Sequence, residues 1–417
     1  MRTNKKIMDS DNSYKYYRLE NGIGVVFKRN HSIVAHSGVF INVGSRDEEK
    51  DEEGIAHFIE HAIFKGTEHR KPYHILNRID GVGGELNAYT TKEETCVYAS
   101  ALCQHLERCL ELFADILFHS TFPDKELAKE KDVVLDEINS YKDVPSELIF
   151  DEFEEMFFDG HSLAHNILGS PKNIRKFSAE KIRNFMTRNY TTDRMVISVV
   201  GNVDFDKVIR LCKKYFEQFP SSKSSAVRLS PEKCVVFDKT LNKHIHQVHV
   251  LIGCRTYNTY SDNKVAFTLL NNLLGGPALN SRLNIAIREK YGLCYNIESQ
   301  YNAFSDVGLF YVYAAMDADF KDRIVDLVFQ EIRKIKDVGI TESQLKAAKQ
   351  QLMAQIAIST ESPLNEMQAM GKSFLNFGRV DSIDEINDDI QKIDCNLLKH
   401  IANEIFIEDN FSKLLYY

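Results

Sequence analysis

The sequence feature that most constrains the fold is an internal repeat, which emerges when the two halves of the chain are aligned with an offset of 210 residues. Residues 54–66 then align with residues 264–276, and both stretches keep the same apolar spacing and a closing glycine. Two further stretches have counterparts in the second half: residues 97–101 with 311–315 and, at a slightly larger offset, residues 127–138 with 345–356. Such a repeat indicates that the halves are copies of one domain.

Hydrophobic periodicity in the first half predicts an α+β domain. Short apolar runs between turn residues predict strands at residues 23–28, 34–43, 85–90, 95–102 and 195–200. Apolar positions three or four residues apart predict helices at residues 54–66, 73–79, 106–119, 124–141, 146–158, 178–189 and 205–219. The expected fold is therefore two homologous α+β domains, each an antiparallel sheet covered by helices on one face.

Length and composition set the domain organisation. A chain of 417 residues is too long for one ordinary core, and 43% hydrophobic with 27% charged residues is typical of a globular protein. Residues 220–225 form the most linker-like stretch. We therefore expect a first domain at residues 1–220, a linker at 221–232 and a second domain at 233–417.

Charge and targeting signals limit the partners and the compartment. A net charge of −8 argues against a protein that binds nucleic acid or an anionic membrane. No run of 18 apolar residues is present, so we expect no membrane span. Residues 1–11 lack the apolar run of a secretory signal, and Asp9 and Asp11 are atypical of a transit peptide. The eight cysteines are scattered without a Cys-x-x-Cys pair, which is typical of free thiols in a cytoplasmic protein.

A metal-binding pattern lies in the first copy of the repeat. On a helix, His57 and His61 stand four residues apart, so both imidazoles leave the same face, which Glu60 shares. Two neutral imidazoles one turn apart can hold a zinc ion, and a carboxylate beside them can take a proton from zinc-bound water. The alternative is an amphipathic helix in which two histidines have this spacing by chance.

The second copy of the repeat separates these two interpretations. It keeps the apolar scaffold but has Phe267, Leu270 and Asn271 at the three polar positions. If the polar residues served only the fold, both copies would be expected to keep them. The difference favours a functional role for the polar residues of the first copy.

A zinc site with two histidines and an open water position needs a third protein ligand. The helix predicted at residues 124–141 carries Glu130 and Glu137, which are two turns apart and share one face. Glu137 lies among apolar neighbours, where a carboxylate needs a strong partner, and Glu130 would then orient the ligands from behind. The alternative is a solvated acidic face, and spacing alone does not select Glu137.

The whole pattern resembles the pitrilysin/insulinase family of zinc peptidases. His57-x-x-Glu60-His61 is followed 76 residues after His61 by Glu137. Further matches occur in the family's order at residues 44–47, 64–67, 83–90, 281–283 and 288–295. The resemblance covers about residues 20–400, and in size it is closest to the branch of mitochondrial processing peptidase and its bacterial homologues.

The resemblance implies a role for each residue of the first-half site. It assigns one zinc ion per chain to His57, His61 and Glu137. It also assigns the work of the general base to Glu60 and an accessory role to Glu130. The implied activity is that of a zinc metalloendopeptidase.

The resemblance extends to residues that would contact the substrate. Arg288 and Tyr295 match the pair that reaches the substrate and stabilises the oxyanion at the scissile carbonyl; without the family, Tyr295 reads as a core aromatic. The family also has an edge strand that binds an extended peptide by β-augmentation. The residues that match this strand are Asn87, Ala88, Tyr89 and Thr90. Asn87 is equally typical of a turn.

The resemblance also implies an assembly. In the family, two such chains, or one double-length chain, enclose a clamshell chamber that admits peptides or unfolded polypeptide segments. Because this chain carries the functional residues of both halves, we expect a homodimer in which Arg288 and Tyr295 act on the partner's zinc site. The alternative function is that of a non-catalytic structural or partner subunit, although such members usually lose the zinc residues.

Overall fold

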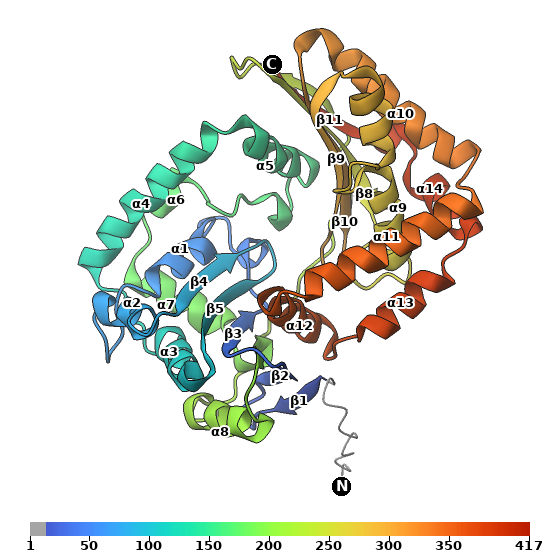
Figure 1. Ribbon diagram of the computed structural model, residues 1–417. Coiled ribbons are helices and arrows are strands. Elements are labelled where there is room, and N and C mark those ends of the chain that lie inside the picture. Colours follow the sequence, from blue (N-terminus) through green and yellow to red (C-terminus); the bar gives the residue numbers. More distant parts are fainter. Residues whose placement is uncertain (1–13) are drawn as a thin grey trace. The chain divides into compact units, whose positions relative to one another are not determined.

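The computed structural model describes residues 14–417, so the expectation for residues 1–11 lies outside the described residues. The chain divides into two compact units, drawn in Figure 1. Unit 1 runs up to Leu135 and adds Ile167–Ala226 and Ser359–Asp381. Unit 2 consists of Asp136–Asn166, Val227–Ile358 and Ser382–Tyr417.

Unit 1 is built on a six-stranded sheet in the order β1-β2-β6-β3-β5-β4. Neighbouring strands pair antiparallel except β2 and β6, which are parallel. The strands are β1 (Lys15–Arg18), β2 (Gly24–Arg29), β3 (Val34–Ile41), β4 (Glu85–Thr90), β5 (Thr95–Leu102) and β6 (Met195–Gly201). The helices are α1 (Ile55–Ala62), α2 (Pro72–Asp80), α3 (Leu106–Phe118), α6 (Pro171–Ile174), α7 (Ala179–Asn189), α8 (Phe205–Phe216) and α12 (Pro363–Phe377), together with the part of α4 (Asp124–Lys142) up to Leu135.

Unit 2 is built on a five-stranded sheet in the order β7-β11-β8-β10-β9, in which β7 and β11 are parallel. The strands are β7 (Asp238–Leu241), β8 (Val248–Thr256), β9 (Cys294–Ala303), β10 (Gly308–Met316) and β11 (Ser412–Tyr416). The helices are α5 (Pro145–Phe157), α9 (Lys264–Gly275), α10 (Lys321–Asp337), α11 (Glu342–Thr360), α13 (Ile383–Lys392) and α14 (Cys395–Ile405), with a π-helical segment at Asn284–Glu289.

The two sheets share one topology, which confirms the duplication that the sequence repeat predicts. The order β2-β6-β3-β5-β4 in unit 1 corresponds to β7-β11-β8-β10-β9 in unit 2. The parallel pair recurs at the same place in both sheets. In unit 1 the late strand β6 lies between β2 and β3, and in unit 2 the last strand, β11, lies between β7 and β8. The sheets are therefore mixed rather than wholly antiparallel, since a parallel pair is possible where a long helical connection separates its strands.

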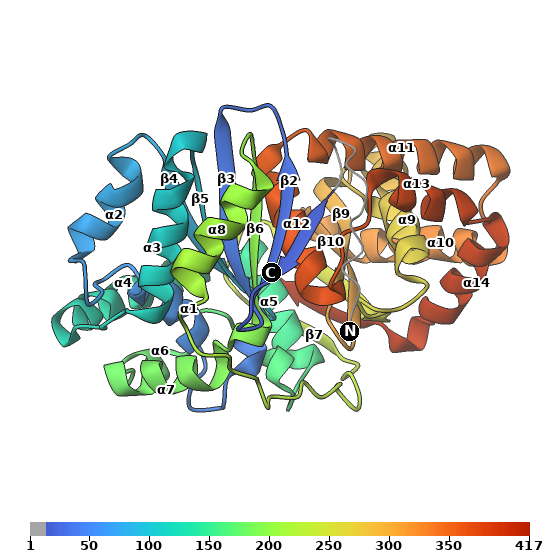
Figure 2. The same cartoon turned by 90° about the horizontal axis from the view of Figure 1, so that it is seen from below.

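The expectation that helices cover only one face of each sheet is wrong. In unit 1, Met367, Met370 and Phe374 of α12 pack against Val26 and Phe40 on one face of the sheet. Helices α3 and α8 pack against each other and against the strands β3, β5 and β2 (Figure 2). A second covering layer is needed because these strands are buried at nearly every position.

Unit 2 has the same two-sided arrangement. Helices α9, α10 and α14 lie on one side of the sheet (Figure 1), and they supply one apolar cluster with the strands β8 and β10. On the opposite face, Phe153 and Phe157 of α5 pack with Tyr311 and Tyr313 of β10. Alternate residues of β10 thus belong to two different cores.

These covering helices explain why the compact units differ from the contiguous halves expected from the sequence. Helix α5 precedes the predicted linker but belongs to unit 2, and α12 lies in the second half but belongs to unit 1. A unit boundary after Ala226 falls within the predicted linker at 221–232, a stretch without helix or strand. Among the described residues, none of the helices combines the length and the apolar character needed to cross a bilayer.

Candidate metal centre

The helix that carries the histidine motif is fixed at its first residue. Gly54 precedes α1 with φ of 94°, and a Cβ at this position would lie 2.7 Å from the Cα of Gly169. The backbone N–H groups of Gly54 and Ala56 each donate to the buried Glu48 carboxylate at 2.9 Å. Positive φ, close packing and the two hydrogen bonds to Glu48 together set where α1 begins and which face it presents.

Three predicted ligands converge in the structure. His57 and His61 on α1 have ring centroids 4.7 Å apart. Candidate ligand atoms of His57, His61 and Glu137 all lie within 4.8 Å of one another. Helix α4 continues without a break across the division between the compact units. It places Glu137 two turns beyond Glu130. Two imidazoles and one carboxylate are a donor set of catalytic zinc sites, which keep a fourth position open.

His57 is held in the protonation state that a metal ligand needs. Its side chain is buried in α1. Burial, with a smaller contribution from the neighbouring His61, lowers the pKa of His57 to about 4. The imidazole is therefore neutral at pH 7 and offers a lone pair to a cation.

The second histidine is oriented by a buried carboxylate. His61 Nδ1 donates to Glu130 Oε1 at 2.9 Å, and Lys65 Nζ donates to Glu130 Oε2 at 2.7 Å. Burial alone would raise the pKa of Glu130, but these two hydrogen bonds outweigh it and leave the pKa below its ordinary value. The ionised Glu130 thus fixes the His61 tautomer and leaves Nε2 as the ligand atom. This observation fits a zinc ion at the site.

Glu60 is positioned from a neighbouring strand. Thr90, the last residue of β4, donates its hydroxyl to Glu60 Oε2 at 2.7 Å. The resemblance assigned Thr90 to substrate binding, whereas in the structure its side chain holds the predicted general base.

The predicted substrate strand lies at a sheet edge. Among the described residues, β4 pairs only with β5, so its outer backbone edge is available to an extended peptide. Asn87 is exposed and Ala88 is half-buried on this strand. Tyr89 is held differently, because its hydroxyl donates to Glu94 Oε1 at 2.9 Å.

Arg288 and Tyr295 both belong to unit 2. Arg288 lies in the π-helical segment, and its Nη1 donates to Asn284 Oδ1 at 3.4 Å. Tyr295 is the second residue of β9 and is 62% exposed, with its hydroxyl 3.4 Å from Asp317 Oδ1. The reading of Tyr295 as a core aromatic is therefore wrong. Single-turn π-helices are frequent at functional sites.

Sequence reasoning missed two residues that support the site, Lys65 and Glu48, and it assigned Thr90 to substrate binding rather than to the positioning of Glu60. Lys65 is four residues beyond His61, so helical spacing was a usable signal for it. Glu48 and Thr90 offered no such signal, because each reaches α1 through the tertiary fold rather than along the helix.

Family comparison covers both copies of the repeat. The model described as Insulinase (Peptidase family M16) matches residues 25–171. The model described as Peptidase M16 inactive domain matches residues 176–352, which include the copy with Phe267, Leu270 and Asn271.

Full-length relatives show the same similarity. The chain is 33% identical to the uncharacterized zinc protease YmxG of Bacillus subtilis, over 95% of this chain and 96% of that protein. It is also 33% identical to the uncharacterized zinc protease ML0855 of Mycobacterium leprae, over 93% of this chain and 88% of the relative.

Solved structures share the fold. A protease from Helicobacter pylori superposes with a TM-score of 0.88 and 23% identity, covering 97% of this chain and 99% of that one. A peptidase M16 inactive domain from Pseudomonas fluorescens gives a TM-score of 0.90 and 19% identity, with 97% of each chain covered.

Proposed function

The chain belongs to the insulinase (M16) peptidase family, and we propose that it is a zinc-dependent endopeptidase acting on peptides or unfolded polypeptide segments. The observation that carries the proposal is the convergence of His57, His61 and Glu137, with Glu130 hydrogen-bonded behind His61. The curated relatives are named zinc proteases, which supports zinc as the metal.

The chain's own residues supply binding and proton transfer. A zinc ion held by His57, His61 and Glu137 would supply Lewis acidity, which lowers the pKa of water and polarises a carbonyl. Glu60 accepts a proton from the attacking water and delivers it to the leaving amine. The Thr90 hydroxyl keeps the Glu60 carboxylate in one orientation during both transfers.

Substrate binding uses backbone hydrogen bonds at the edge of β4. An extended peptide aligned there pairs through its main chain, so binding demands little of the peptide's sequence. Only an extended or unfolded segment can present its backbone in this way. A stably folded substrate cleaved at the rate of an unfolded one would contradict this part of the proposal.

The first test combines metal content with cleavage. Purified protein should hydrolyse a quenched fluorogenic peptide, lose activity when a chelator removes zinc and regain it when zinc is added back. His61→Ala and Glu137→Gln chains should retain less zinc after dialysis, by elemental analysis, and should cleave at least 10²-fold more slowly because a ligand is missing. Wild-type protein that takes up zinc and cleaves nothing would favour a non-catalytic subunit instead.

The assembly we propose is a homodimer in which Arg288 and Tyr295 act on the partner's site. The support is that one chain carries both the metal-ligand set and these two residues. Glu60→Gln and Arg288→Ala chains, each weakly active alone, should regain activity when mixed, because one intact site then forms per dimer. A mass near one chain in light scattering at working concentration would contradict the dimer.

We also propose a cytoplasmic location. All eight cysteines lie within the described residues and are free thiols. Unpaired cysteines in this number suit a reducing compartment.

A further inference from the structure

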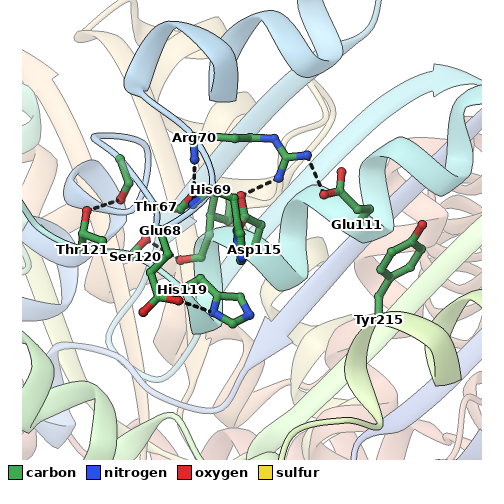
Figure 3. Close-up of polar contacts among 12 residues, drawn as sticks. Thr67, Glu68, His69, Arg70, Glu111, Asp115, His119, Ser120, Thr121 and Tyr215 are labelled. Atoms are coloured by element: carbon green, nitrogen blue, oxygen red, sulfur yellow. Dashed lines mark hydrogen bonds and ion pairs between the residues drawn. The ribbon is translucent and has the colours of Figure 1, made fainter.

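A second group of metal-ligating side chains lies on the segment that follows α1. The backbone of this segment is fastened to the end of α3: Glu68 N–H donates to the His119 carbonyl at 2.9 Å, and Thr121 N–H donates to the Gly66 carbonyl at 3.0 Å. Thr67 and Ser120 form an isolated β-bridge between these two bonds. The backbones that carry Glu68 and His119 are therefore held side by side, as Figure 3 shows.

The side chain of His69 is fixed by a buried carboxylate. Asp115 on α3 is 4% exposed, and its Oδ1 accepts from His69 Nδ1 at 2.6 Å. Its other oxygen accepts from the Thr67 hydroxyl at 2.9 Å and from Arg70 Nη1 at 2.6 Å. With Nδ1 committed to Asp115, the outward atom of His69 is Nε2, which is the atom a cation would bind.

The remaining two side chains complete a donor set. His119 Nδ1 lies 3.2 Å from Glu68 Oε2, and the His69 and His119 rings lie edge to face at 4.7 Å. Candidate ligand atoms of Glu68, His69 and His119 all lie within 4.8 Å of one another. The Glu68 and His69 side chains are more than half exposed, so a cation reaches them directly from solvent.

We propose that Glu68, His69 and His119 form a second divalent-cation site, which binds zinc and is distinct from the site on α1 and α4. Two imidazoles with one carboxylate suit zinc and its borderline neighbours, whereas magnesium and calcium prefer sets made only of oxygen. The site repeats the construction of the first one, since Asp115 stands behind His69 as Glu130 stands behind His61.

A cation at this site links the segment after α1 to the end of α3. Its effect is on stability, because it joins side chains whose backbones already pair. The inference does not rest on the proposed peptidase activity, and its readouts are metal uptake and thermal stability.

The test is a zinc titration of chelator-stripped, full-length protein by isothermal calorimetry. Wild type should bind two equivalents with different affinities. Glu68→Gln and His69→Ala chains should lose the weaker equivalent, or bind it at least tenfold less tightly, and keep the stronger one. His61→Ala should show the reverse, losing the stronger equivalent and keeping the weaker.

Controls separate loss of the site from loss of the fold. His31→Gln, on an exposed histidine elsewhere in unit 1, should leave both equivalents in place. Glu68→Gln changes an exposed side chain, so its metal-free melting temperature should match that of wild type, while the rise in melting temperature on adding the second equivalent disappears. The proposal is overturned if wild type, Glu68→Gln and His69→Ala bind zinc identically.

Discussion

At the scale of single residues, the candidate metal centre depends on a carboxylate that is not one of its three candidate ligands. Glu130 accepts hydrogen bonds from His61 and from Lys65 in a buried position. Removing its charge frees His61 to take the other tautomer or turn away. Glu130→Gln should weaken zinc binding about 10- to 100-fold, measured by competition with a chromophoric chelator.

The matched control lies one turn earlier on the same helix. Glu126 is partly exposed and pairs with Lys129, so Glu126→Gln should leave the zinc affinity unchanged. Equal affinities for the wild type and the Glu130→Gln chain would show that Glu130 does not orient His61.

Thr90 is a positioning residue for the proposed general base. Thr90→Val keeps the shape of the side chain but removes the donor to Glu60 Oε2. We expect kcat for peptide hydrolysis to fall about tenfold, equivalent to about 1.4 kcal/mol, with KM and zinc content little changed. Thr90→Ser should restore most of the rate. If KM rises and kcat is unchanged, Thr90 acts in substrate binding instead.

His249 on β8 should make stability depend on pH. Burial lowers the pKa of this imidazole, and its Nδ1 lies 2.7 Å from the Tyr313 hydroxyl. Burial and nearby Glu298 raise the pKa of Tyr313 to about 12, so the phenol stays protonated beside the neutral ring. As the pH falls below about 6.5, the unfolded chain takes up a proton before the folded one, and folding loses stability.

The comparison that isolates this effect is His249→Gln against wild type. Denaturant midpoints measured between pH 7.5 and 5 should fall less steeply in the variant, because the titrating group is gone. Parallel pH profiles for the two proteins would exclude His249 as a contributor.

At the scale of elements, the apolar periodicity of the sequence correctly predicted the positions of individual strands and helices. The strands predicted at residues 85–90 and 95–102 coincide with β4 and β5, and the motif helix carries its two histidines on one face. The covering helices α5 and α12 were not assigned to their sheets, because apolar periodicity shows that a helix has a buried face but not which sheet buries it. Likewise, the Thr90–Glu60 contact depends on where β4 lies beside α1.

Helix α12 approaches its sheet so closely that glycine is required. A Cβ at Gly371 would overlap the ring of the buried Phe40, which belongs to the central strand β3. Gly371→Ala should therefore destabilise the fold by about 1–3 kcal/mol, although alanine favours a helix over glycine. Denaturant unfolding monitored by circular dichroism measures the change.

The exposed face of the same helix supplies the control. Ala369→Ser should shift the free energy of unfolding by no more than about 0.5 kcal/mol. A Gly371→Ala protein as stable as wild type would show that α12 does not pack tightly on β3.

At the scale of the whole molecule, the two copies of the repeat share one architecture and differ at the motif positions. Both units keep the same sheet topology, but only the first copy of the aligned helix has polar residues at all three motif positions. The sequence repeat predicted this duplicated architecture. The compact units nevertheless depart from the two sequence halves, because each takes one covering helix from the other half.

We propose that Glu60 performs proton transfer beside a metal held by His57, His61 and Glu137. The most direct test is the rate of peptide hydrolysis by zinc-loaded Glu60→Gln protein, compared with wild type at equal zinc content. Because general acid–base catalysis contributes about 10²–10⁴-fold, we predict a loss of that size without loss of zinc. A Glu60→Gln chain that holds zinc and cleaves at the wild-type rate would contradict the claim.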